Sequence, residues 1–126
     1  MGIRAVLAIR AVYAAAMLTF WITVPDACEA VGLPAVLFIT FHVSRVTFEL
    51  TKFGRPAMYR MWSGWLFAAL LTAGLVYGFA VGQSTALLDW AFCVGMAHEL
   101  EGFAVSAILP AWRADVPSVW HAMKLS

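Results

Sequence analysis

The apolar stretch CVGMAHELEGFAVSAIL, residues 93–109, contains three ionisable side chains, His98, Glu99 and Glu101. Imidazole and carboxylate groups can hold metals, move protons or pair with cations. Within a hydrophobic helix such groups are costly and commonly mark a functional site. His98 and Glu101 are three residues apart and share one helix face, whereas Glu99 points nearly the opposite way. We expect the first face to meet the interior of a helix bundle, and Glu99 to meet another helix or a hydrated cleft.

A second polar group lies in an earlier apolar stretch. His42, Arg45 and Glu49 follow each other at i, i+3 and i+7, which places them on one helix face. Counted along the expected helices, His42 and Arg45 lie at heights near those of His98 and Glu101. Arg45 is therefore expected to pair with Glu101, or with Glu49 on its own helix. The group is either a structural ion pair that locks the bundle or, as we favour, a polar cavity open to the cytoplasmic face.

Two kinds of cofactor fit these residue types. Histidines on facing helices, here His42 and His98, can ligate a haem iron from both sides. A cluster of His and Glu can instead hold a divalent metal, whose identity the residue types leave open. The sequence HELE lacks the second histidine of the H-E-x-x-H zinc motif.

The elements that must position these groups are apolar helices. The chain has 126 residues, of which 63% are hydrophobic and 12% charged, far from the balance of a soluble domain. Four segments approach the length of roughly 20 residues that a spanning helix needs: about 3–24, 33–50, 57–81 and 86–109. Pro25, Pro34, Pro56 and Pro110 are expected at their edges. The sequence predicts an all-α, polytopic membrane bundle, a single domain over residues 1–126 with an interfacial tail at 110–126.

The basic residues predict the orientation of this bundle. The connections 25–32 and 82–85 contain no Lys or Arg. With four spans, every basic residue then falls on one side, which the positive-inside rule makes cytoplasmic. Both termini are expected on that side. The net charge of +1 gives no basic surface for nucleic acid, so no nucleic-acid partner is expected.

Three glycines, Gly74, Gly78 and Gly82, recur every four residues in the third segment. Small residues at this spacing let helices approach closely in lipid. Packing is the simpler interpretation. The same ridge could also support a homo- or hetero-oligomer, as in a non-catalytic subunit that packs against a larger membrane partner.

A resemblance covers roughly residues 53–124. FGRPAMYRMWSGWLFAALL, followed by MAHELEGFAVSAILPAWRADVPSVWHAMK, resembles the C-terminal half of bacterial CDP-alcohol phosphatidyltransferases. Three features carry the resemblance: a GRP turn before a helix, an acidic pair and a characteristic ending. In this sequence the ending reads Leu109, Pro110, Trp112, Asp115, Val116, Ser118, His121 and Ala122.

The resemblance implies a helical bundle in the bacterial inner membrane that transfers a phosphatidyl group from a CDP-linked donor to an alcohol, assisted by Mg or Mn ions. The family's catalytic signature, D-x-x-D-G-x-x-A-R followed by G-x-x-x-D-x-x-x-D, is absent from this sequence. Tyr59 and Gly64 also stand where the family pattern would have a His and a Lys. No catalytic residue is therefore assigned.

The prediction is an integral membrane protein of phospholipid biosynthesis that binds a phosphorylated lipid precursor, such as CDP-diacylglycerol, among membrane lipids. Its polar cavity is expected to be lined by His42, Glu49, His98, Glu99 and Glu101. The candidate phosphate-binding residues are Arg45, Lys52, Arg55 and Arg60. A haem- or metal-binding membrane protein and a non-catalytic subunit remain the alternatives.

Overall fold

The computed structural model describes residues 3–57, 59, 61–113 and 116–125. These residues form five helices and no strand: α1 (Ile3–Thr23), α2 (Ala27–Phe53), α3 (Trp62–Val81), α4 (Ala86–Ile108) and α5 (Val119–Leu125). The first four are long and apolar enough to cross a membrane. The expected all-α bundle with four candidate spans is confirmed.

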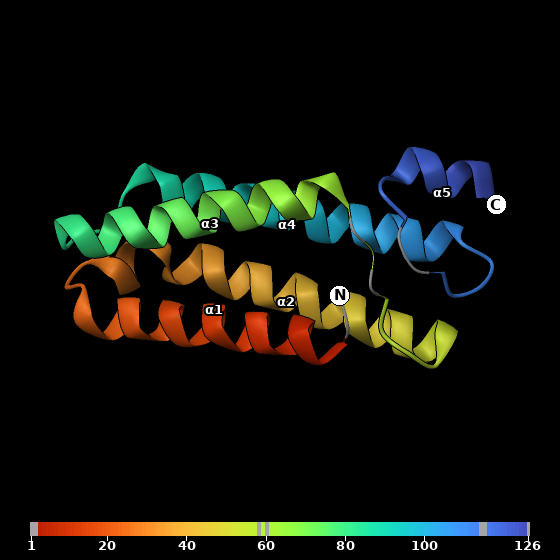
Figure 1. Ribbon diagram of the computed structural model, residues 1–126, viewed down its shortest axis with the longest axis horizontal. Helices are drawn as coiled ribbons and strands as arrows, with labels where there is room; N and C mark the ends of the chain where they lie inside the picture. Colours follow the sequence, from red (N-terminus) through yellow and green to blue (C-terminus); the bar gives the residue numbers. More distant parts are fainter. Residues whose placement is uncertain (1–2, 58, 60, 114–115, 126) are drawn as a thin grey trace.

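The four long helices run alternately up and down in an elongated bundle (Figure 1). α4 packs against both α2 and α3, and α1 packs against α2 and α3 on the other side. The short α5 lies beside the C-terminal part of α4. Four passes bring the start of α1 and the end of α4 to the same end of the bundle. This arrangement fits the predicted topology, and the cytoplasmic assignment of that end stays a prediction.

α2 begins at Ala27, earlier than the expected start near residue 33, so Pro34 lies inside the helix and not at its edge. Pro34 has no N–H, so one hydrogen bond of the helix is lost there. Helices that cross lipid tolerate this loss when neighbouring helices support them. The tight turn before α2 is held from outside, because Asp26 Oδ1 accepts a hydrogen bond from the backbone N–H of Ser84 at 3.2 Å.

α3 begins at Trp62, later than the expected start near residue 57. α2 ends where Gly54 adopts a left-handed conformation with φ 75° and donates its N–H to the Leu50 carbonyl. The backbone N–H of Ala57 then donates to Glu49 Oε2 at 2.9 Å. This bond turns the connection back towards α2, and Met61 is extended and buried before the helix starts.

The glycine ridge of α3 packs inside this chain. A Cβ added at Gly74 would lie 2.9 Å from Leu88 of α4, and one at Gly78 would lie 2.6 Å from Phe20 of α1. Gly82 ends α3 with φ 71°. Close intramolecular packing therefore accounts for Gly74 and Gly78. The oligomer contact stays a prediction, which expression of the chain without a neighbouring subunit would test.

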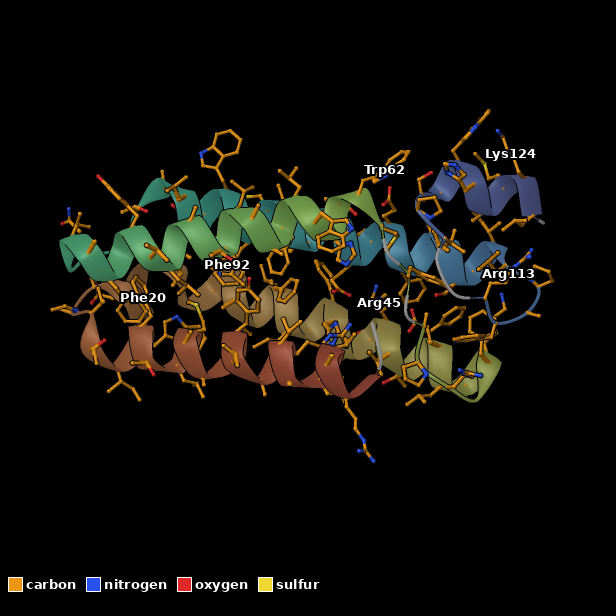
Figure 2. All side chains as sticks on the ribbon, viewed as in Figure 1. Phe20, Arg45, Trp62, Phe92, Arg113 and Lys124 are labelled. Atoms are coloured by element: carbon orange, nitrogen blue, oxygen red, sulfur yellow. The ribbon has the colours of Figure 1, made fainter. Side chains whose placement is uncertain are left out.

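Apolar side chains fill the bundle and also cover its outside. Phe20 and Phe92 are buried between the helices, whereas Trp62 projects from the surface (Figure 2). Ile22 is 82% exposed and Leu33 70% exposed. An apolar surface on all four long helices is compatible with an integral membrane protein, because such a surface is unfavourable in water. The interfacial position of residues 110–126 stays a prediction; α5 buries Ala122 and exposes Trp120 and Lys124.

Candidate functional site: a cavity between the helices

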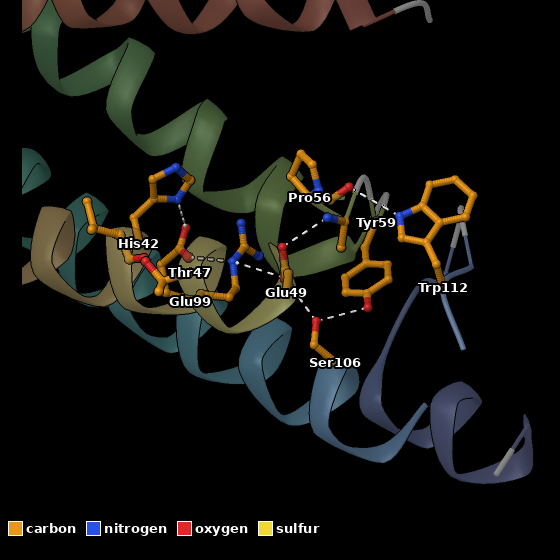
Figure 3. Close-up of polar contacts among 11 residues, drawn as sticks. His42, Thr47, Glu49, Pro56, Tyr59, Glu99, Ser106 and Trp112 are labelled. Atoms are coloured by element: carbon orange, nitrogen blue, oxygen red, sulfur yellow. Dashed lines mark hydrogen bonds and ion pairs between the residues drawn. The ribbon is translucent and has the colours of Figure 1, made fainter. Parts of the chain in front are cut away.

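Charged side chains from α2 and α4 meet inside the bundle. Arg45, Glu49 and Glu99 are at most 5% exposed. Glu99 Oε1 lies 3.1 Å from His42 Nδ1, and Glu99 Oε2 lies 2.9 Å from Arg45 Nε (Figure 3). The Arg45–Glu99 contact has the distance of an ion pair but not the angles of a hydrogen bond. Arg45 Nε and Glu99 Oε2 have no hydrogen-bond partner among the described residues. Charge attraction therefore holds the two helices together at this level.

Glu99, and not Glu101, is the partner of Arg45 on α4. Glu99 shares its helix face with Gly102 and Ser106, which contact Arg45 and Glu49 of α2. Gly102 makes room for the guanidinium, since a Cβ at this position would collide with Arg45 Nη1. The second expected partner is found as well: Arg45 Nε lies 3.7 Å from Glu49 Oε1, one turn along α2.

His98 and Glu101 face α3 and are linked by one of its hydroxyl groups. Ser63 Oγ donates to Glu101 Oε1 at 3.0 Å and lies 2.9 Å from His98 Nδ1. The imidazole rests against the backbone at Gly64, where an added Cβ would lie 3.1 Å from His98 Cε1. The polar residues of α4 are thus divided between two neighbouring helices, with Glu99 against α2 and His98 against α3.

Glu49 belongs to a buried network beside the cavity. Its Oε2 accepts from the Ala57 N–H, and its Oε1 accepts from Ser106 Oγ at 2.9 Å. Because the Ser106 proton is used in this way, the Tyr59 hydroxyl at 2.9 Å must donate to Ser106 Oγ. Burial raises the pKa of Tyr59. This network joins α2, the α2–α3 connection and α4.

The predicted phosphate-binding cations do not converge on one site. Lys52 Nζ donates to the Ser106 and Ala107 carbonyls at 2.8 and 2.9 Å, which compensates the unpaired carbonyls at the end of α4. The Arg55 guanidinium lies 3.5 Å from the centre of the Trp112 ring, and Trp112 Nε1 donates to the Pro56 carbonyl. Arg60 lies outside the described residues. Of the three predicted cations that the structure describes, Arg45 alone reaches the interior of the bundle.

A cavity of about 580 Å³ lies between the four long helices. One end is polar and is lined by Arg10, His42, Arg45, His98 and Glu99. Apolar and aromatic side chains line the rest, among them Phe38, Phe67 and Phe92. The predicted cavity residues Glu49 and Glu101 are not part of the lining. The cavity reaches the bundle surface where Ala14 and Leu18 of α1 and Ile39 of α2 are both exposed and part of its wall.

Arg10 lines the cavity but was not among the predicted site residues, because the sequence marked it only as one of the basic residues that orient the bundle. It has no ion-pair partner among the described carboxylates. An arginine more than one turn inside an apolar span is itself a functional signal. Its position opposite Arg45 depends on how α1 packs against α2, which the sequence does not show.

The described residues do not fit a metal held by side chains alone. Among them no three His, Cys, Asp or Glu residues are grouped so as to hold a metal ion. The carboxylates nearest the cavity are already engaged by Arg45, His42 and Ser63. The Mg or Mn chemistry of the resembling family therefore has no ligand set in the part of the chain that the structure describes.

Comparisons of this chain with models of protein families, with curated protein sequences and with solved structures found no match.

Proposed function

We propose that this protein binds an amphiphile with an anionic head group in the cavity between its helices. The observation that supports this function is the division of the cavity into a long apolar part and one cationic end. Arg10 and Arg45 form that end, and among the described residues Glu99 is the one carboxylate in its lining. Arginine is well suited to phosphate groups, because its donors form a rigid, permanently charged fork.

The dimensions suit part of a lipid. Ligand pockets commonly enclose about 300–1,000 Å³, and this cavity holds about 580 Å³. Arg10 and Trp21 line it three helical turns apart, about 16 Å along α1. The phosphate would lie at the polar end, and the upper part of the hydrocarbon among the aromatic side chains. The opening beside Leu18 and Ile39 would let the remaining chain lie in the surrounding lipid.

We place this binding function in phospholipid biosynthesis in the bacterial inner membrane, with a CDP-linked lipid such as CDP-diacylglycerol as the first candidate ligand. The support is the resemblance of residues 53–124 to CDP-alcohol phosphatidyltransferases. The proposal is confined to binding, because the aspartate signature that carries catalysis in that family is absent from this sequence.

The test is lipid binding by the purified protein in detergent, measured by native mass spectrometry. CDP-diacylglycerol is compared with phosphatidylcholine and diacylglycerol. Arg10→Gln should weaken binding of CDP-diacylglycerol about 10-fold or more, which is the worth of one charge-assisted hydrogen bond. Arg4→Gln is the matched control, since Arg4 lies on the same helix outside the cavity lining. Equal binding of diacylglycerol and CDP-diacylglycerol would overturn the proposal.

A second candidate function is haem binding. His42 and His98 line the same cavity from α2 and α4. A tetrapyrrole needs only two axial ligands from the protein, so the lack of a larger ligand cluster does not weigh against it. The purified protein would then show a Soret band that is lost in His42→Asn and in His98→Asn. A colourless protein that takes up no added haem would exclude this candidate.

A further inference from the structure

The two imidazoles at the polar end of the cavity are each fixed through one ring nitrogen. His42 Nδ1 lies 3.1 Å from Glu99 Oε1. Glu99 is also paired with Arg45, which is always charged, so it is present as a carboxylate and can only accept. His42 Nδ1 must therefore carry the proton. The other ring nitrogen, Nε2, is turned away from Glu99 (Figure 3).

His98 reaches the same state through a different partner. The hydroxyl proton of Ser63 is donated to Glu101 Oε1, so Ser63 Oγ can only accept from His98 Nδ1. His98 Nδ1 then carries the proton. In a neutral imidazole with a protonated Nδ1, Nε2 is a hydrogen-bond acceptor. No described residue donates a hydrogen bond to Nε2 of either His42 or His98, and both side chains line the cavity.

These contacts set two acceptors beside two cations. A phosphate oxygen cannot bind to an imidazole lone pair, because both groups are acceptors. Arg10 and Arg45 suit the phosphate, whereas His42 and His98 need a hydrogen-bond donor from the ligand. An ammonium head group would donate, but it would lie beside two guanidinium groups of the same charge. A hydroxyl donates without that repulsion.

We infer that the head group of the bound lipid is an anionic phosphodiester that also carries hydroxyl groups, which His42 and His98 recognise through Nε2. This inference rests on the proposed function and makes it more specific. It selects lipids whose phosphate is esterified with a polyol or a sugar. A CDP-linked lipid satisfies the same requirement through its anionic diphosphate and its ribose hydroxyls. Phosphodiesters of equal charge without hydroxyl groups are disfavoured, because the two acceptors would stay unpaired next to them.

Two lipids that differ only in these hydroxyl groups provide the test. Phosphatidylglycerol and phosphatidylmethanol with identical acyl chains are both singly charged phosphodiesters, and only the first has free hydroxyls. The two lipids compete for the protein, with phosphatidylcholine as the zwitterionic reference. We expect about 10-fold preference for phosphatidylglycerol, because each of two hydrogen bonds contributes about threefold or more in affinity. Equal binding of the two anionic lipids, with both above phosphatidylcholine, would overturn the inference and leave the proposed function standing. If neither exceeded phosphatidylcholine, the proposed function itself would fail.

The matched variants are His42→Asn and His98→Asn. The asparagine amide nitrogen can replace Nδ1 as the donor to Glu99 or to Ser63, while nothing in its side chain reaches the place of Nε2. Each variant should keep its thermal stability and lose about threefold or more of the preference for phosphatidylglycerol. His121→Asn is the control, since His121 lies on α5 beside Ser118 and outside the cavity lining. An unchanged preference in both variants would overturn the inference, and so would an equal loss in the control.

Discussion

Replacing Glu49 with alanine removes the acceptor at the centre of the buried network beside the cavity. Glu49 is fully buried, and it accepts from the Ala57 N–H and from Ser106 Oγ. Arg45 Nε also lies 3.7 Å away from it. A buried donor that loses its acceptor costs about 1–3 kcal/mol, and breaking a buried ion pair on one side costs about 3–5 kcal/mol. Because Arg45 keeps Glu99, the ion-pair cost does not apply in full, and the two donors that lose their acceptor set the expected loss. We expect Glu49→Ala to lower the free energy of unfolding by about 2–6 kcal/mol.

Glu49→Gln should have an intermediate effect. Glutamine keeps one acceptor oxygen, but its amide nitrogen can only donate. The oxygen can serve the Ala57 N–H or the Ser106 hydroxyl, and the other group loses its acceptor. The expected cost is about 1–3 kcal/mol. The order of stability is therefore wild type, then Glu49→Gln, then Glu49→Ala.

The assay is reversible unfolding in mixed detergent micelles. The helix content of the protein is measured as the fraction of SDS rises. Glu29→Ala is the control, because Glu29 is exposed in the first turn of the same helix and contributes less than about 1 kcal/mol through the helix dipole. If Glu49→Ala cost no more than Glu29→Ala, the buried network would not stabilise the turn between α2 and α3.

Two further predictions concern residues beside this network. Gly102→Ala should reduce lipid binding and stability, because a Cβ at this position would collide with Arg45 and move it from Glu99. Gly32→Ala is the control, because no atom lies within 4 Å of its added Cβ. It should stabilise α2 by about 0.5–1 kcal/mol in the same unfolding assay. Burial raises the pKa of Tyr59 above its ordinary value of 10.0, so the neutral phenol is favoured in the folded state and its contribution to stability is complete below about pH 10. That contribution is lost as the pH rises through the higher pKa of Tyr59 in the folded protein. Tyr59→Phe should therefore lose less stability above pH 10 than the wild type does. An identical fall of the free energy of unfolding with pH in both proteins would contradict this.

The sequence determined the class of fold. Four apolar stretches of spanning length in a chain that is 63% hydrophobic leave few alternatives to helices, since a helix satisfies its own backbone within each stretch. The ends of the helices were less well predicted. Pro34 lies inside α2 and the start of α3 is delayed to Trp62, because contacts to Ser84 and Glu49 decide how the chain turns.

The sequence also identified which polar residues matter, but not how they pair. Helical periodicity separated Glu99 from the face of His98 and Glu101, yet it could not show that Glu99 is the residue packed against Arg45. Periodicity fixes directions around one helix axis. Contacts between helices depend on how each helix is rotated and shifted relative to its neighbours.

Only the tertiary structure brought Arg10 to the cavity and separated it from Lys52 and Arg55, which are used for capping and stacking. It also fixed the tautomers of His42 and His98, since these depend on acceptors supplied by α4 and α3. The physical reason is the same in each case. Hydrophobicity and period are properties of one segment, whereas a cavity and its hydrogen-bonding character are produced where several segments meet.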